Sequence, residues 1–401
     1  MKILIITPFF PYSKVYHAGG KFTYEIIKVL SQRHEIYLLS RIEPDQFVFV
    51  DEMKKFCAHI ELFPFKTPET ANIVSILRII VSYLSLGLKA NKLIKSEAFD
   101  VVQVEHVETG LLIKKTRNLP MILDAHDVIT KPAKRRYVAS KGILKKTFNY
   151  LRWKVTTKVE KYITRKFDKI FTLSKQDKKI LLKMNKDLSI SVVPYPVTDT
   201  IPTLGYKREP KTLLFAGAMH RDVNVESVLY FYEKIWPCIR QEIPDAKFYI
   251  VGNKPDQRVL ALAKKDKDVV VTGFVEKLEP YYLRASVFVS PLFIGGGIIA
   301  KNLQAMAIGL PVVTTSIGNE GIEAVPDRDI LIADDPDAFA EKVLFLLRDT
   351  QKWEEIAQNG RMFVLKNFGL KSVIKKIEDS YRVLLSIRNK QSCDAFLKNS
   401  G

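Results

Sequence analysis

The stretch VFVSPLFIGGGIIAKNLQAMAIGLPVVTT, residues 287–315, contains the pattern that decides the fold. It opens with four residues typical of a buried strand and passes through a turn with three consecutive glycines. An amphipathic segment typical of a helix follows, and a Gly-Leu-Pro turn then leads into a β-branched run at Val312. A strand, a helix and a second strand in this order predict a parallel β-α-β unit.

The same alternation extends over most of the chain. In the first half, apolar runs predict strands at 2–7, 35–39, 101–104, 121–124, 169–173 and 190–193, with clear helical patterns at 21–31 and 144–166. In the second half, strands are expected at 212–217, 247–252, 269–273, 287–290 and 311–315, with helices at 226–242, 259–264, 278–285 and 300–307. The pattern of residues 336–387 predicts helices without strands. Strands that alternate with helices predict parallel sheets covered by helices on both faces.

A cluster of prolines between the two halves is the best candidate for a linker: Pro194, Pro196, Pro202 and Pro210. The length of 401 residues suits two or three domains. We therefore expect an α/β protein with two Rossmann-like, doubly wound parallel-sheet domains that face a cleft. The expected boundaries are 1–195 for the first domain, 196–210 for the linker and 211–368 for the second domain.

The charge of the chain is unevenly distributed. The net charge is +19, and the segment 131–186 alone holds 19 basic and 3 acidic residues. Such a field attracts polyanions, namely anionic lipid, phosphorylated acceptors or nucleic acid. No base-reading module is recognisable, so we do not expect nucleic acid as a partner. We interpret 131–186 as a surface that docks on an anionic membrane, with a plain solvated helix face as the alternative.

Cysteine usage and hydropathy favour the cytoplasm. The three cysteines are scattered, without the spacing of a metal site or a disulfide framework. The start of the chain, KILIIT, reads as a first strand and not as a signal peptide. The most apolar window, 73–88, is short for a membrane span and contains Arg78, so no transmembrane helix is expected. We expect a cytoplasmic protein, peripheral at the inner face of the membrane.

Three glycines directly ahead of a helix suit the binding of an anion. Gly295, Gly296 and Gly297 let a ligand approach the backbone without a Cβ in the way, and the helix N-terminus offers unpaired N–H groups and partial positive charge. Ligands of open parallel sheets sit outside the carboxyl ends of the strands. A diphosphate fits this place, and Lys301 could add a point charge one turn into the helix. A merely flexible turn and a solvated lysine are the alternatives.

Longer stretches of the chain resemble a known family. TLLFAGAMHRDVNVESVLYF, VVVTGFVEKLEPYYLRASVFVSPLFIGGG and LQAMAIGLPVVTTSIGNEGIE, in this order within 211–349, resemble the C-terminal half of retaining glycosyltransferases of the GT-B fold, family 4. DVVQVEHVETG and ILDAHDV in the first half resemble it more loosely. The resemblance implies transfer of a sugar from a UDP- or GDP-linked donor to a glycan or lipid-linked acceptor, with retention of the anomeric configuration.

The resemblance further implies a separate role for each of the two domains. The second domain would bind the donor and the first the acceptor, without a cofactor and without a metal ion. The Asp-x-Asp segments at 266–268 and 327–329 lie in polar turns and are not expected to bind metal. A final helix at 369–390 would cross back onto the first domain, with 381–387 as its candidate contact and 391–401 as a disordered tail.

Site residues follow from the resemblance and from strand ends. On the donor side we expect the glycine turn with Lys301 at the diphosphate, Gln304 at the ribose, and further nucleotide contacts from Gly217, Arg221, Phe274 and Val275. His126, in LDAHDV, is the candidate catalytic residue that contacts the transferred sugar; a structural histidine is the alternative. Gly19, Gly20 and Glu105 are expected on the acceptor or phosphate side, with His106 next to Glu105 and Asp127 as a cap of the next turn.

Two positions depart from the family's pattern. The family carries two glutamates separated by seven residues, and in one subgroup a glycine, here Gly296, replaces the first. The second is Gln304 in this chain. An amide still bonds ribose hydroxyls, but the loss of a charged acceptor costs about 1 kcal/mol. Ile299 also stands where the subgroup has arginine. A weakened or inactive relative that acts as a binding protein, and a nucleotide-sugar 2-epimerase on the same fold, are therefore kept as alternatives.

Overall fold

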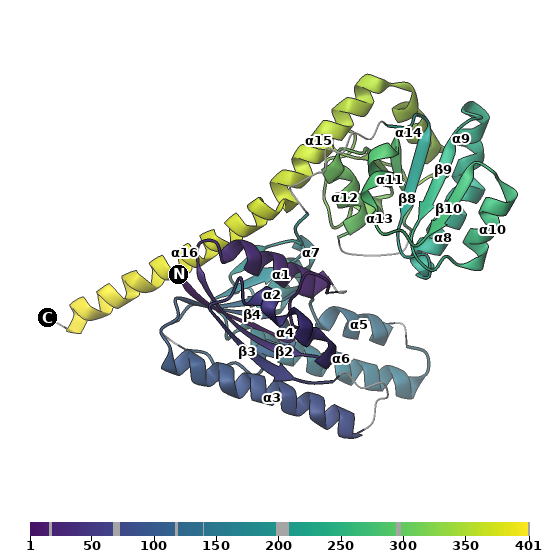
Figure 1. The fold of residues 1–401 in the computed structure, drawn as a ribbon. Coiled ribbons are helices and arrows are strands. Elements are labelled where there is room, and N and C mark those ends of the chain that lie inside the picture. Colours follow the sequence, from purple (N-terminus) through teal and green to yellow (C-terminus); the bar gives the residue numbers. More distant parts are fainter. Residues whose placement is uncertain are drawn as a thin grey trace. The chain divides into compact units, whose positions relative to one another are not determined.

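The computed structural model describes residues 1–15, 18–66, 73–116, 119–138, 140–197, 208–293 and 298–399. The chain divides into two compact units, one made of Met1–Tyr195 with Val373–Gly401 and the other of Pro196–Ser372. Each unit contains a parallel sheet with helices packed against it, as Figure 1 shows. The α/β class with two doubly wound sheets, predicted from the alternating pattern, is confirmed.

The first unit is built on a seven-stranded sheet in the order β3-β2-β1-β4-β5-β6-β7. Neighbouring strands are parallel, and Ile3 of β1 pairs with Ile36 of β2 and Val101 of β4. The strands are β1 (Lys2–Thr7), β2 (Glu35–Ile42), β3 (His59–Pro64), β4 (Val101–Glu105), β5 (Met121–Asp124), β6 (Lys169–Thr172) and β7 (Ile190–Val192). The helices between them are α1 (Ala18–Leu30), α2 (Val50–Met53), α3 (Ile73–Ser96), α4 (Val107–Gly110), α5 (Thr130–Val138), α6 (Ile143–Thr164) and α7 (Lys175–Met184).

The second unit repeats this plan with six parallel strands in the order β10-β9-β8-β11-β12-β13. The strands are β8 (Thr212–Ala216), β9 (Lys247–Val251), β10 (Val269–Gly273), β11 (Val287–Ser290), β12 (Val312–Thr314) and β13 (Leu331–Ile332). The helices are α8 (Asp222–Tyr230), α9 (Trp236–Glu242), α10 (Gln257–Lys265), α11 (Glu279–Arg284), α12 (Ala300–Ile308), α13 (Ser316–Asn319), α14 (Pro336–Arg348) and α15 (Thr350–Phe368). The β-α-β unit expected at 287–315 is β11-α12-β12. Gly309, with φ of +83°, ends α12 because glycine adopts the left-handed conformation that closes a helix.

The core of each unit has two layers because successive strand residues point to opposite faces of the sheet. In β8, Leu213 and Phe215 lie in one apolar cluster, whereas Leu214 and Ala216 lie in the other. All four side chains are buried. A strand that is apolar on both faces is what a parallel sheet covered by helices requires, and this explains why TLLFA is an unbroken apolar run.

The last helix, α16 (Leu370–Asn399), begins in the second unit and packs in the first from Val373 onward. Tyr381 is fully buried there, and its hydroxyl donates to Oε1 of Gln103 in β4. A helix that returns to the first unit is thus confirmed, and Tyr381, the first residue of the expected contact at 381–387, makes the contact. The helix runs to Asn399, through most of the segment that the sequence analysis assigned to a tail.

Two strands were not expected from the sequence, and one expected helix has a different start and an irregular turn. β3 lies at the edge of its sheet with a half-exposed sequence ending in Pro64, and β13 has only two residues, so neither forms a recognisable apolar run. The helix expected at 226–242 begins earlier, at Asp222, and contains a π-turn at Phe231–Ile235. Pro237 lacks an N–H and crowds the carbonyl four residues before it, which disfavours a regular α-helix at this point.

Candidate functional site

In both units, the strand order reverses between two central strands. The chain winds outward from β8 in one direction and from β11 in the other, and it does the same from β1 and β4 in the first unit. Loops that leave the carboxyl ends of such a strand pair diverge, and ligands of open parallel sheets bind where they do. The loops after β8 and β11, and those after β1 and β4, are therefore the places to search for a site.

The loop after β8 is packed tightly around glycine. A Cβ on Gly252, at the end of β9, would lie 1.7 Å from the carbonyl oxygen of Gly217 at the end of β8. A Cβ on Gly217 would in turn lie 2.9 Å from the Nδ2 atom of Asn224, which donates to the carbonyl of Ala218. Asn224 is buried in the first turn of α8. The loop after β8 thus approaches the end of β9 and the start of α8 as closely as glycine permits.

Asn224 also joins this loop to α12. Nζ of Lys301 donates to Oδ1 of Asn224 at 2.9 Å and lies 3.8 Å from the centre of the Phe215 ring. Burial, together with the charge of Arg221, lowers the pKa of Lys301 to about 7. In the described part of the chain, Lys301 forms no ion pair with a carboxylate. Two cations that converge without a carboxylate between them form a site that an anion would relieve.

The other predicted donor residues are distributed around this point. Arg221 is the exposed residue immediately ahead of α8, and Gln304 lies one turn after Lys301 on the same side of α12, half-buried. Phe274 is largely exposed after β10, whereas Val275 packs against the apolar core. Gly295, Gly296 and Gly297 lie outside the described residues, so the structure places the helix that they precede but not the turn itself.

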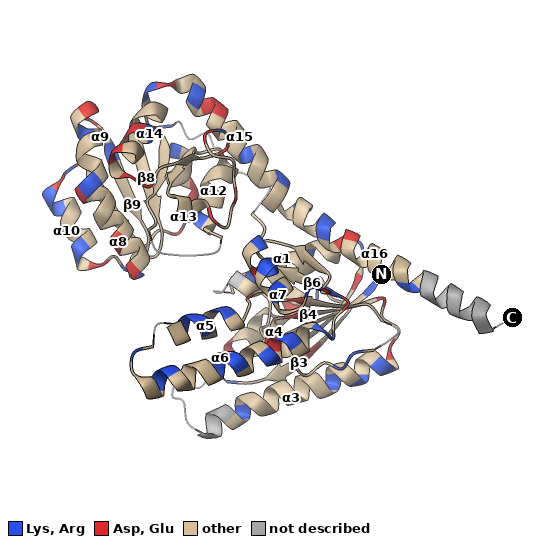
Figure 2. Ribbon diagram, turned by 180° about the vertical axis from the view of Figure 1, so that it is seen from behind, with Lys and Arg blue, Asp and Glu red and all other residues tan. Residues whose placement is uncertain are grey.

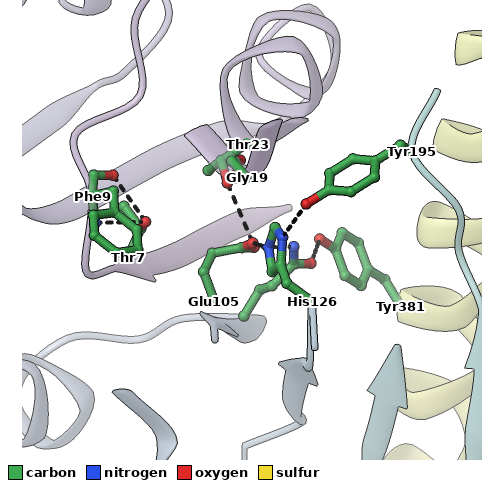
Figure 3. Close-up of polar contacts among 9 residues, drawn as sticks. Thr7, Phe9, Gly19, Thr23, Glu105, His126, Tyr195 and Tyr381 are labelled. Carbon is green, nitrogen blue, oxygen red and sulfur yellow. Dashed lines mark hydrogen bonds and ion pairs between the residues drawn. The ribbon is translucent and has the colours of Figure 1, made fainter. Parts of the chain in front are cut away.

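In the first unit, the ends of β4 and β5 bring together a charged cluster, drawn in Figure 3. Oε2 of Glu105 lies 2.6 Å from Nε2 of His126, and both side chains are buried. Glu105 also accepts from Nε2 of Gln103 at 2.7 Å and from the hydroxyl of Thr23 at 3.3 Å. The hydroxyl of Tyr195 lies 3.3 Å from Nδ1 of His126. The imidazole is therefore held at both nitrogens.

A second carboxylate raises the charge of the cluster. Asp124 is fully buried, and within the described structure neither of its oxygens has a hydrogen-bond partner. Burial raises the pKa of Asp124 to about 7, against the lowering effect of His126. Burial alone would lower the pKa of His126, but the charges of Asp124 and Glu105 outweigh it and raise that pKa to about 9. The two carboxylates thus favour the protonated form of His126.

The first turn of α1 closes over this cluster. A Cβ on Gly19 would lie 3.2 Å from Nε2 of His106 and 3.5 Å from Nδ1 of His126. The two imidazole rings stack with their centres 4.1 Å apart and their planes within 6°. His106 has a φ of +66°, an uncommon value for a residue with a side chain, which directs it over His126. Gly20 follows Gly19 in the same turn and is buried.

The structure thus brings together Glu105, His106 and His126, which were expected at strand ends, with Gly19, which was expected at the acceptor or phosphate side. It adds Asp124, Tyr195 and Asn224, which sequence reasoning missed. Asp124 could have been found, because it ends the strand that precedes His126. Tyr195 gave no signal beyond its position among prolines. The cap expected from Asp127 is supplied instead by Glu160 of α6, whose carboxylate accepts from the backbone N–H groups of Ile129 and Thr130.

The cluster could also bind a metal ion. One ligand atom from each of Glu105, Asp124 and His126 lies within 4.8 Å of the others. The hydrogen bond between Glu105 and His126, however, occupies a nitrogen and an oxygen that would bind the ion. A buried imidazolium between carboxylates already balances their charge, so we assign the cluster to holding a proton.

Comparison with known proteins finds a family match within the second unit. Residues 210–349 match the family of glycosyl transferases group 1. This match shows that the second unit is similar to that family. The match covers β8 to the end of α14, where Asn224, Lys301 and Gln304 lie.

Individual relatives are distant. An "Uncharacterized 44.6 kDa protein in cps region" of Klebsiella pneumoniae is 28% identical over 172 residues, a match that spans 41% of this chain and 44% of that protein. The Escherichia coli enzyme UDP-Gal:alpha-D-GlcNAc-diphosphoundecaprenol alpha-1,3-galactosyltransferase is 25% identical over 79% of this chain and 83% of its own. HepE of Anabaena, solved in complex with UDP, superposes with a TM-score of 0.63 at 13% identity, over 96% of this chain and all of that one. The last similarity supports the fold alone.

In the described residues, no helix combines the length and the hydropathy needed to span a bilayer.

Proposed function

We propose that the protein transfers a sugar from a nucleotide-diphosphate donor to a glycan or lipid-linked acceptor, with retention of the anomeric configuration and without a metal ion. The observation that carries the proposal is the pair Lys301 and Arg221. They follow the two central strands of the second sheet and lack a carboxylate partner in the described structure; Arg221 stands directly ahead of α8, and Lys301 lies in the first turn of α12. A diphosphate would supply the missing negative charge.

The residues of this edge would act together on the departing nucleotide. As the bond between sugar and diphosphate breaks, negative charge grows on the diphosphate, and fixed cations and N–H donors stabilise that charge. Lys301 would regain its proton fully when a phosphate approaches, because an anion raises the pKa of a neighbouring ammonium group. Gln304, one turn further, would bind the ribose through its amide.

On the acceptor side, we propose that His126 orients the transferred sugar. Its imidazolium is fixed by Glu105 and Tyr195 at the carboxyl edge of the first sheet, next to Gly19. The side chain is buried beneath the first turn of α1, so a sugar would reach it through movement of that turn. This proposal predicts that His126→Gln raises KM for the donor sugar or lowers kcat while nucleotide affinity stays unchanged.

For the donor we propose UDP- or GDP-linked sugars, with UDP supported by the E. coli relative, whose name contains UDP-Gal. The same name contains diphosphoundecaprenol, which supports a lipid-linked acceptor. We place such an acceptor, and hence the enzyme, at the anionic inner face of the membrane.

The experiment that tests the proposal is calorimetry with UDP, GDP, ADP and their sugars, followed by donor hydrolysis without acceptor. We expect one diphosphate to bind, and Lys301→Met to weaken it while His126→Gln does not. A chain that binds no nucleotide would instead be a non-catalytic relative, as the change at Gln304 allows.

A second candidate function, a nucleotide-sugar 2-epimerase, is favoured by one observation. The cluster of Glu105, Asp124 and His126, with His106 stacked on it, assembles carboxylates and imidazoles of the kind that proton transfer requires. The two activities are distinguished in deuterated water, where an epimerase introduces deuterium next to the anomeric carbon of the donor sugar. A transferase leaves that position unlabelled.

A further inference from the structure

Helix α6 exposes its apolar side. Its apolar row, which we define as Leu144, Phe148, Leu151, Val155 and Tyr162, has side chains that are 57–89% exposed. The spacings of four, three, four and seven residues place all five along one line of the helix. A row of this kind ordinarily faces the core of a protein, so its exposure needs a separate explanation.

The other side of α6 packs against the unit, and it holds both polar and apolar residues. Asn149, Glu160, Ile163 and Thr164 are buried, and Ile163 lies in the apolar core. Glu160 holds the helix in this orientation, because its carboxylate accepts from the backbone N–H groups of Ile129 at 2.8 Å and Thr130 at 3.1 Å, at the start of α5. The fold therefore keeps the apolar row turned outward by a specific buried contact.

Cations flank the apolar row on both sides. At 100° per residue, Lys145 and Arg152 project on one side of the row and Lys154, Lys158 and Arg165 on the other, and all five are exposed. The single acidic residue of α6 is the buried Glu160. Figure 2 shows this run of basic residues along α5 and α6. The surface thus calls for a partner that is apolar in its middle and anionic at its edges.

Aromatic rings join α6 to α5 on the side of α6 away from the apolar row, because Trp153 follows Leu144 by nine residues and lies about 180° from it around the helix. The rings of Tyr137 and Trp153 stack with centres 5.6 Å apart, and the ammonium groups of Lys134 and Lys154 lie 5.8 Å and 5.0 Å from the centre of the Trp153 ring. Tyr150 is the exposed ring of this group, and a tyrosine next to lysine is typical of protein surfaces at the headgroup level of a bilayer.

We propose that α6, together with α5, lies in the interface of an anionic phospholipid bilayer, with the apolar row at the acyl boundary and the cations at the headgroups. A second copy of this chain fits less well, because it would bring an equal set of cations to the same face. The proposal rests on the proposed function only for its purpose, which is to hold the enzyme where a lipid-linked acceptor lies.

The test is flotation of the full chain with vesicles of phosphatidylcholine, alone or with about 30 mol% phosphatidylglycerol, an anionic lipid. We expect binding to the anionic vesicles only, and weaker binding as salt is added. Combined Leu144→Ser, Phe148→Ser and Leu151→Ser should weaken binding at least about tenfold, because three exposed apolar side chains no longer insert. Lys154→Gln with Lys158→Gln should weaken it about fivefold per cation.

Helix α3 provides the matched control, since Leu84 and Leu88 are also exposed apolar residues of the first unit. Leu84→Ser with Leu88→Ser should leave vesicle binding unchanged, and circular dichroism should show that every variant is folded. Equal binding by the α6 serine variant, or equal loss in the α3 variant, would overturn the assignment. The assignment would also be overturned if light scattering showed a dimer of the wild-type chain and a monomer of the α6 serine variant.

Vesicle binding is measured without donor or acceptor, which separates the two proposals. A chain that binds anionic vesicles but transfers no sugar contradicts only the proposed function. A chain that transfers sugar to an acceptor in detergent but does not float with vesicles contradicts only this surface.

Discussion

Oε2 of Glu105 lies 2.6 Å from Nε2 of His126, at the ends of two neighbouring strands, and both side chains are buried. This pair fixes the imidazole and keeps its proton. Charge-assisted hydrogen bonds of this kind are about twice as strong as neutral ones, and burial strengthens them further. The protonation of His126 is thus a property of its neighbours, and it can be changed through them.

Asp124→Asn should lower the pKa of His126. Burial opposes the imidazolium, and the charge of Asp124 is the largest influence that supports it. The amide has the same shape and no charge, so we expect a clear downward shift without unfolding. The shift is read from the imidazole proton resonances in a pH titration, with His126→Gln to assign the signal. Asp127→Asn is the matched control with a smaller expected shift, and an unchanged pKa in Asp124→Asn would contradict the prediction.

The stability of the first unit should fall as pH rises from about 6.5 to about 9. His126 has a raised pKa in the folded chain, so its contribution is fully present below the usual 6.5 and is lost as pH passes through about 9. Asp124 acts in the same direction at lower pH, since burial raises the pKa of this carboxyl from 3.8 to about 7, and its contribution is lost as pH rises between these two values. Denaturant unfolding at several pH values measures this. His126→Gln should flatten the slope between 6.5 and 9.

Lys301→Met should weaken nucleotide diphosphate binding about tenfold or more, because a charge-assisted bond to phosphate is worth about 1.5–3 kcal/mol. The same change should alter the melting temperature of the ligand-free chain little, because relief of the buried lysine charge offsets the hydrogen bond that Oδ1 of Asn224 loses. Calorimetry and thermal unfolding check the two parts. Lys264→Met, at an exposed lysine of α10, is the control. Undiminished binding in Lys301→Met would place the diphosphate elsewhere.

Much of the fold could be predicted because both sheets are parallel and covered on both faces. Their central strands, such as KILIIT and TLLFA, are continuous apolar runs between turn residues, and a short window reveals them. The edge strands β3 and β13 give no such signal, because their residues pair on one side only and are partly exposed.

The site was predictable only where a strand end marks it. Glu105 and His126 follow strands, whereas the contact of Lys301 with Asn224 joins residues 77 positions apart and depends on the order of strands in the sheet. The outward orientation of the apolar row of α6 could not be predicted from the sequence either. Its periodicity fixes the apolar row but not the side on which the unit lies, and the buried contact of Glu160 decides that.

Gln304→Glu should strengthen nucleotide binding by about tenfold, if the side chain binds the ribose. A carboxylate accepts hydrogen bonds from hydroxyl groups more strongly than an amide does, by about 1 kcal/mol or somewhat more. Gln304 is half-buried on α12, so the added charge stays partly in solvent, one turn of the helix after Lys301. Competition calorimetry with the diphosphate and the free base separates ribose from base contacts. Unchanged affinity would remove Gln304 from the ribose.

Gly252→Ala should destabilise the second unit by about 3 kcal/mol or more, since large losses of this size are typical of overpacked or strained backbone positions. The new Cβ would lie 1.7 Å from the carbonyl oxygen of Gly217, and neither backbone can retreat without breaking the hydrogen bond from the Gly217 N–H to Val251. Gly273→Ala is the matched control in the same unit. It also has a positive φ, but no atom lies within 4 Å of its Cβ position, so only the backbone cost of about 1–2 kcal/mol is expected. Denaturant unfolding compares the two. Equal losses would mean that backbone conformation, and not the close approach of the two loops, makes glycine necessary at position 252.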